Sequence, residues 1–200
     1  MDKANTSRIN PLGGALDGAT TVPGDKSISH RAVLFSAMAQ GTSRLTGVLD
    51  SADVRASIAA VKALGAEVSM ERQIDGSLAG GITGWGEKGP KQPEAPIDCA
   101  NSGTTARLLM GILAPWDIRV EITGDESLIK RPMRRIIAPL MKMGVRFEPD
   151  AKENLPITEI GNPSLKAITY DSPMASAQLK TAVLLAGLFA KGTTTINEPA

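Results

Sequence analysis

The amino-acid sequence predicts a mixed fold of the α/β or α+β class, in which helices and strands alternate along 200 residues. Two observations lead to this prediction. Polar turns, apolar helical runs and short strand-like segments follow one another in a constant order. The same order recurs with glycines in matching places, since Gly47 and Gly124 are 77 positions apart and Gly41 and Gly192 are 151 positions apart. The chain is therefore built from a repeated unit.

Each unit is expected to contain a polar turn, an apolar helix, a strand, an amphipathic helix and one or more closing strands. In the first unit we expect helices after Lys26-Ser27 and from Ser51 to Leu64, and strands at 41–47 and 66–68. Gly65 ends the second helix, as glycine commonly does. The Gly-Glu-Lys-Gly-Pro segment at 86–90 then separates this unit from the next.

The second and third units follow the same order. Expected elements are helices at 107–114 and from Arg131-Pro132 to Met143, strands at 118–124 and 145–147, and finally a helix at 182–190 and a strand at 192–197. The first helix of each unit is almost continuously apolar, which predicts burial on all sides.

The units are placed at 23–97, 98–171 and 172–200, and the third is much shorter than the others. We therefore expect residues 21–200 to form one domain with an incomplete third unit. Residues 1–20 are expected to belong with a second domain, in a longer protein that continues beyond Ala200.

Composition argues against several classes of function. The net charge is +1 and no block of lysine or arginine occurs, so nucleic acid is not an expected partner. His30 is the only histidine and Cys99 the only cysteine, which argues against a structural metal site or an internal disulfide. The longest apolar run, 182–190, is too short to span a membrane. A cytoplasmic protein that binds small molecules is expected.

The segment Pro23–Arg31 has the pattern of an anion site. A lysine and two serines stand where an apolar helix begins, and the free N–H groups and dipole of a helix start attract phosphate. Lys26 adds a positive charge there. Asp25 is expected to face away or to orient Lys26. His30 is assigned no catalytic role, because it fits equally well as a packing residue.

Polar turns in the other units occupy the same position: Asn101-Ser102-Gly103-Thr104 and Ser176-Ala177-Gln178. Packing around a pseudo-threefold axis would bring all the turns to one end, where they form a single pocket for an anionic ligand. Gly103 lets a ligand approach the backbone, and Arg131 offers a bidentate fork. Structural roles remain open: Asn101 and Thr104 as helix caps, Arg131 paired with Asp125 or Glu126, and Ser176 as a small buried residue.

Four segments together carry a family resemblance: Pro23–Arg31, Asn101–Leu108, Lys130–Met133 and Pro173–Gln178. In order and spacing they strongly resemble the signatures of the 5-enolpyruvylshikimate-3-phosphate (EPSP) synthase family, over nearly the whole chain. The resemblance implies the first domain of such an enzyme without its last segment. It further implies an inside-out α/β barrel, in which βαβαββ units share buried helices, and no metal or organic cofactor.

The resemblance implies transfer of the enolpyruvyl group of phosphoenolpyruvate to the 5-hydroxyl of shikimate 3-phosphate, releasing phosphate, on the route to chorismate and aromatic amino acids. Lys26 would contact both substrates and act in catalysis. The other implied contacts are Ser27, Arg31, Ser176, Ala177 and Gln178 for shikimate 3-phosphate, and Asn101, Gly103, Thr104 and Arg131 for phosphoenolpyruvate. The inhibitor glyphosate is expected to fit, because Gly103 is retained.

The family's proposed acid and base groups lie in the second domain. This chain is therefore expected to bind shikimate 3-phosphate weakly and to need the C-terminal half, in cis or in trans, for turnover. Other functions remain open. The related UDP-N-acetylglucosamine enolpyruvyl transferase typically has Lys-Asn in place of Lys26-Ser27 and carries a reactive loop cysteine, whereas Cys99 is expected to be a buried structural thiol. A non-catalytic module that binds a phosphorylated ligand is the other alternative.

Overall fold

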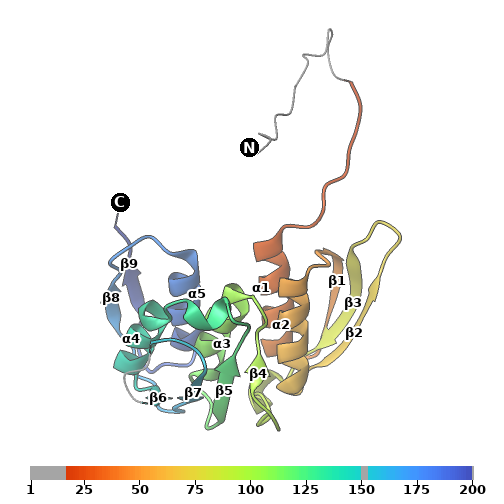
Figure 1. Cartoon of the computed structure of the whole chain (residues 1–200). Coiled ribbons are helices and arrows are strands. Elements are labelled where there is room, and N and C mark those ends of the chain that lie inside the picture. The colour runs from red at the N-terminus through yellow and green to blue at the C-terminus, as the bar shows by residue number, and fades with distance from the viewer. Residues whose placement is uncertain (1–16, 150–152, 200) are drawn as a thin grey trace, which may run out of the picture.

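Three separate β-sheets surround a group of helices in the computed structural model, which describes residues 17–149 and 153–199 (Figure 1). The predicted mixed α/β class is confirmed, since helices and strands alternate through the described chain. Within these residues, no helix has the length and apolar character needed to cross a membrane. Most of the predicted N-terminal segment 1–20, namely residues 1–16, lies outside the described residues.

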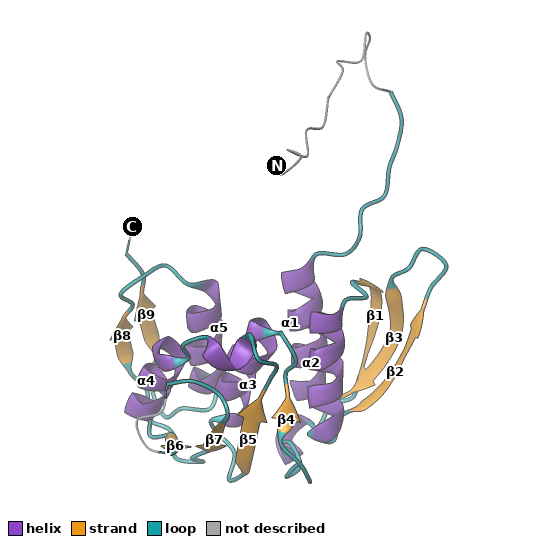
Figure 2. Ribbon diagram, viewed as in Figure 1, coloured by secondary structure: helices purple, strands orange, loops and turns teal. Residues whose placement is uncertain are grey.

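The first sheet has the antiparallel strand order β1-β3-β2, and helices α1 and α2 lie beside it (Figure 2). Its elements are α1 Lys26–Met38, β1 Thr42–Val48, α2 Ala52–Ala63, β2 Glu67–Arg72 and β3 Leu78–Thr83. Asp25 caps α1 by accepting the N–H of Ile28 at 2.7 Å, so its carboxylate faces the helix backbone. Gly24 is required by packing, because a Cβ there would lie 2.1 Å from the carbonyl oxygen of Gly47.

The second sheet has strand order β4-β5-β7-β6, in which only β4 and β5 are parallel. The elements of this part are η1 Gly86–Lys88, β4 Ile97–Asp98, α3 Gly103–Leu113, β5 Arg119–Thr123, η2 Leu128–Lys130, α4 Arg134–Met143, β6 Arg146–Glu148 and β7 Ile157–Ile160. Helix α4 begins later than the predicted start at Arg131-Pro132. A 3-10 turn precedes it and leaves Arg131 extended, with ψ of 133°. Gly144 ends α4 as predicted, with φ of +106°.

The third sheet is a parallel pair, β8 Thr169–Asp171 and β9 Thr195–Asn197, joined through α5 Ala177–Gly187. The helix expected at 182–190 begins earlier, because Ser176 caps it by accepting the N–H of Leu179. The strand expected at 192–197 is shorter by a few residues.

Helix α3 lies at the centre of the helix group, and all of its residues except Thr104 are buried. It crosses α5 closely, because a Cβ at Gly111 would lie 2.2 Å from the carbonyl oxygen of Ala182. The prediction of burial on all sides is wrong for α1 and α5. Phe35, Leu184 and neighbouring apolar residues line an open groove of about 560 Å³ between these helices, which no described element fills.

Candidate active site

The first turns of α3 and α5 are in contact, and α1 reaches α5 one turn further along. Gln178, in the first turn of α5, donates from Nε2 to Thr104 Oγ1 in the first turn of α3, at 2.9 Å. Arg31, in the second turn of α1, donates to Thr181 Oγ1 on α5 at 3.0 Å. The first contact joins the polar turns at 101–104 and 176–178, and the second connects α1 to α5 through Arg31.

The start of α3 is held by a different cap from those considered in the sequence. Ser102, rather than Asn101 or Thr104, accepts the N–H of Thr105 at 3.2 Å. The chain reaches this position through Ala100, whose φ of +47° is the left-handed conformation and costs about 1 kcal/mol for a non-glycine residue. This backbone turn leaves the Asn101 side chain available for other contacts.

Asn101 stands between Arg131 and Asp125. Its Oδ1 accepts from Arg131 Nη2 at 2.6 Å, and its Nδ2 donates to Asp125 Oδ2 at 2.7 Å. The hydrogen bond from Asn101, with backbone N–H groups and the charge of Arg131, holds the pKa of Asp125 below its ordinary value. Arg131 is therefore oriented through Asn101, and not by the direct ion pair with Asp125 or Glu126 that the sequence left open.

A cluster of arginines adjoins Gly103. A Cβ at Gly103 would lie 2.5 Å from Arg107 Nη1 and 3.5 Å from Arg131 Nη1. The absence of a side chain at this position therefore leaves room for the guanidinium groups next to the backbone. Arg107 is only 6 % exposed, and its pKa falls to about 10 because of burial and of the nearby charges of Arg135 and Arg131. Within residues 17–149 and 153–199, none of these three arginines forms an ion pair with a carboxylate. They line a pocket of about 490 Å³ that suits an anion.

The amide of Gln178 is oriented by the same cluster. Its Oε1 accepts from Arg107 Nη1 at 3.1 Å and from Arg135 Nη2 at 3.4 Å. Guanidinium groups only donate hydrogen bonds, so the amide NH2 must point the other way, toward Thr104. Sequence reasoning missed Arg107 and Arg135. The sequence did carry a signal for Arg107, which stands in an otherwise apolar helix, because arginine is almost never fully buried without a partner.

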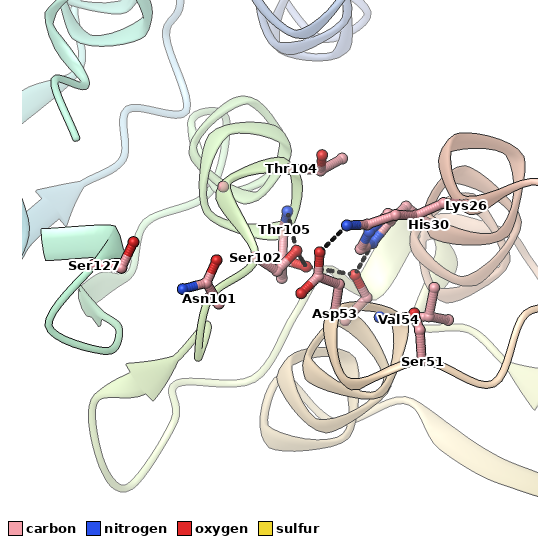
Figure 3. A network of polar contacts seen from close by, with 12 residues as sticks. Lys26, His30, Ser51, Asp53, Val54, Asn101, Ser102, Thr104, Thr105 and Ser127 are labelled. Carbon is pink, nitrogen blue, oxygen red and sulfur yellow. Dashed lines mark hydrogen bonds and ion pairs between the residues drawn. The ribbon is translucent and has the colours of Figure 1, made fainter. Parts of the chain in front are cut away.

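Lys26 pairs with a carboxylate on a neighbouring helix, and not with Asp25. Its Nζ forms an ion pair with Asp53 in the first turn of α2 (Figure 3). Arg31 also donates to the carbonyl oxygen of its neighbour Ser27 at 3.2 Å. Ser27 and Ala177 are exposed at their helix starts.

Comparison with known proteins identifies the family. A family model described as EPSP synthase (3-phosphoshikimate 1-carboxyvinyltransferase) matches residues 12–200. The chain belongs to the EPSP synthase family. A 3-phosphoshikimate 1-carboxyvinyltransferase of Xanthomonas campestris pv. campestris (strain B100) is 45% identical over 202 residues, which cover 100% of this chain and 44% of the relative. The corresponding protein of Parvibaculum lavamentivorans is 50% identical over 185 residues, 92% of this chain and 40% of the relative.

Solved structures of the EPSP synthase family have the same fold. The EPSP synthase of Acinetobacter baumannii superimposes with a TM-score of 0.83 at 44% sequence identity, over 92% of this chain and 40% of that chain. The chain thus spans about two fifths of the length of the EPSP synthases that it matches.

Proposed function

We propose that this chain is the substrate-binding first domain of an enzyme that transfers the enolpyruvyl group of phosphoenolpyruvate to the 5-hydroxyl of shikimate 3-phosphate and releases phosphate. The arginine cluster at Gly103 carries this proposal. Both substrates bear phosphate and carboxylate groups, which guanidinium groups bind in bidentate fashion. Membership of the EPSP synthase family supports the same reaction and its place in the shikimate pathway.

The proposed roles follow the family signatures. Lys26 contacts both substrates and acts in catalysis. Shikimate 3-phosphate is assigned to Ser27, Arg31, Ser176, Ala177 and Gln178, and phosphoenolpyruvate to Asn101, Gly103, Thr104 and Arg131. The reaction proceeds through charged, tetrahedral species, which fixed cations and helix N–H dipoles stabilise in a closed site. Glyphosate is proposed to occupy the phosphoenolpyruvate position, since Gly103 adds no bulk there.

We propose that each sheet with its helices is one unit of an inside-out barrel, with boundaries near 23–97, 98–171 and 172–200. The first two sheets are each accompanied by two helices and the third by one, α5. A further amphipathic helix of a longer protein would therefore cover the groove between α1 and α5. Residues 1–20 are assigned to a second domain, and the C-terminal half, in cis or in trans, to the acid and base groups.

Cys99 favours this function over the related UDP-N-acetylglucosamine enolpyruvyl transferase. Its thiol is buried, and burial raises its pKa to about 12, so it does not serve as a reactive loop cysteine. We place the enzyme in the cytoplasm, because its substrates are small soluble metabolites. A non-catalytic module that binds phosphorylated ligands remains the second candidate.

Calorimetric titration tests the proposal. The 200-residue chain is titrated with shikimate 3-phosphate and, as the control ligand, UDP-N-acetylglucosamine, and Lys26→Ala is compared with the matched surface variant Lys191→Ala. Binding of shikimate 3-phosphate alone, weakened at least tenfold only by Lys26→Ala, is expected. Preference for the nucleotide sugar would contradict the substrate assignment. Product formed by the purified chain without a complementing half would contradict the role given to the second domain.

A further inference from the structure

The side chain of Met174 forms part of the wall of the pocket that holds Arg107, Arg131 and Arg135, called the arginine pocket below. Met174 belongs to the segment Pro173–Gln178, which the sequence singled out, but the family signatures imply no role for it. Its thioether sulfur is a weak hydrogen-bond acceptor, and Arg135 Nη1 donates to it at 3.9 Å. The sulfur is thus in direct contact with a guanidinium group of the pocket.

Met174 is also one of two exposed methionines among the described residues. It is 46 % exposed, and Met141 on α4 is 45 % exposed. The other described methionines are buried or partly buried: Met38, Met70, Met110, Met133 and Met143. An oxidant dissolved in water must reach the sulfur atom before it can convert methionine to the sulfoxide. Met174 and Met141 are therefore the two described thioethers that are most open to this reaction.

The backbone around Met174 is held in place. The buried Ser172 donates from Oγ to the carbonyl oxygen of Met174 at 2.5 Å. The N–H of Ser172 donates to the carbonyl oxygen of Asn197 in β9 at 2.8 Å. Pro173, which stands between Ser172 and Met174, has a locked φ. The Met174 side chain therefore starts from a fixed point, and oxidation of its sulfur would change the chemistry of the pocket wall more than its position.

Arg135 has hydrogen-bond donors to spare. Its Nη1 faces a sulfur atom, its Nη2 lies 3.4 Å from Gln178 Oε1, and its buried Nε has no partner among the described residues. Ordinary N–H···O hydrogen bonds are about 2.9 Å long, so neither contact is a strong one. A guanidinium group carries several N–H donors. A stronger acceptor placed beside Arg135 would therefore take up donors that are weakly used now.

We propose that Met174 is a modification site, at which a hydroperoxide oxidises the thioether to a sulfoxide that accepts from Arg135 and weakens anion binding in the arginine pocket. The sulfur lone pair attacks the peroxide, so that an S–O bond forms and the O–O bond breaks. Sulfur is oxidised by two electrons and the peroxide is reduced by two. The proton of the attacked oxygen passes to the departing oxygen, which leaves as water or as an alcohol.

The new oxygen is bonded to an atom that Arg135 already contacts. Oxidation turns a flexible apolar side chain into a polar one without changing its net charge. Because methionine is unbranched and rotates easily, the oxygen can turn toward the guanidinium group. Donors of Arg135 that would bind a phosphate or carboxylate group are then occupied. Only the identification of that anion with phosphoenolpyruvate rests on the proposed function.

Peptide mass mapping after treatment with hydrogen peroxide tests the modification itself. We expect the folded 200-residue chain to gain one oxygen atom at Met174 and one at Met141, whereas the buried Met110, Met133 and Met143 stay unchanged. Methionine sulfoxide reductases should remove both oxygen atoms. Resistance of Met174 under conditions that oxidise the equally exposed Met141 would overturn the proposal.

Replacement by glutamine tests the link to the pocket without an oxidant. Met174→Gln places an amide oxygen beside Arg135, and Met141→Gln is the matched control at the same exposure. Amide NMR checks the fold of each variant and measures its binding of inorganic phosphate and of phosphoenolpyruvate. We expect Met174→Gln to bind both anions about tenfold more weakly and Met141→Gln to bind them as the unaltered chain does.

A leucine variant connects the two tests. Met174→Leu keeps an apolar side chain but has no sulfur to oxidise. It should bind phosphate as the unaltered chain does, both before and after peroxide treatment. Peroxide should weaken phosphate binding about tenfold in the unaltered chain, and the reductases should restore it. An equal loss in Met174→Leu would place the effect at another residue and refute the role of Met174.

The two proposals fail in different ways. Equal anion binding by folded Met174→Gln and the unaltered chain would refute the role of Met174 and leave the proposed function standing. A tenfold effect on phosphate, with no binding of phosphoenolpyruvate by any of the chains, would support the role of Met174 and count against the proposed substrate. If the unaltered chain binds neither anion, the inference is wrong, whereas titration with shikimate 3-phosphate decides the proposed function separately.

Discussion

Glu159 carries a carboxylate in the middle of β7, with both oxygens buried and unpartnered among the described residues. Burial raises its pKa well above the ordinary value of 4.5. The folded protein therefore holds this proton more tightly than the unfolded chain does. By proton linkage, Glu159 costs little stability below pH 4.5, and its cost grows as the pH rises toward the folded-state pKa.

We therefore expect Glu159→Gln to raise the free energy of unfolding by roughly 1–3 kcal/mol at pH 8 and to change it little at pH 4. Urea denaturation at both pH values measures the difference. Glu121→Gln, on the neighbouring strand but exposed, is the control and should have little effect at either pH. The same small effect for Glu159→Gln at pH 8 would show that its carboxylate is satisfied in solution.

Local sequence patterns located only part of the candidate site. Asn101, Gly103 and Gln178 stand in polar turns, so their places at helix starts could be predicted. The pairing of Lys26 with Asp53 could not be predicted. These residues are 27 positions apart in the sequence, and their contact depends on how α1 and α2 pack against each other. The choice of Ser102 as the cap depends on the left-handed turn at Ala100, which no residue preference at that position indicates.

At the scale of elements, the fold depends on the close crossing of α3 and α5. Alanine is normally favoured over glycine inside a helix, yet at Gly111 a Cβ would collide with the backbone of Ala182. The crossing also sets the distance between Thr104 and Gln178 at the helix starts. One glycine thus connects packing in the core with the geometry of the site.

Gly111→Ala is accordingly expected to lower the free energy of unfolding by about 1–3 kcal/mol, against the usual helix preference. Thermal and urea unfolding measure it. Gly81→Ala is the control, because its nearest neighbour would be Thr42 Cγ2 at 3.4 Å, an ordinary contact. A higher free energy of unfolding for Gly111→Ala would contradict this prediction, because it would mean that α3 and α5 can move apart to accommodate the methyl group at no cost in stability.

Element type and order could be predicted because hydrophobic periodicity and glycine stops are local signals, as at Gly65 and Gly144. Boundaries were less predictable. Pro132 resembles a helix-starting proline, but the 3-10 turn at Leu128–Lys130 postpones the helix. Burial of α1 was overestimated, because its continuous apolar pattern does not reveal which neighbours are present.

At the scale of the whole molecule, the groove between α1 and α5 leaves part of the apolar core open. Phe35, Leu184, Leu188 and Phe189 are 43 % to 70 % exposed there. Apolar surface of this kind favours association or the binding of apolar dyes. The groove is also the place where the proposed additional helix of a longer protein would pack.

Leu188→Glu should therefore reduce dye fluorescence and self-association of the 200-residue chain severalfold, because it places a charge in the groove. Dye titration and sedimentation velocity measure these quantities. Ile74→Glu, at a fully exposed apolar residue of the β2–β3 hairpin, is the matched control and should change neither. Equal effects of the two variants would mean that the groove itself contributes neither to dye binding nor to self-association.

The ion pair between Lys26 and Asp53 gives the site an internal competitor. An ammonium group has three N–H donors, so an anion that contacts Lys26 shares this group with a carboxylate already tethered beside it. The neighbouring negative charge of Asp53 weakens the attraction of Lys26 for any anion. An anion that also engages Arg131 and the backbone at Gly103 is therefore expected to bind best, because those groups lie outside the ion pair.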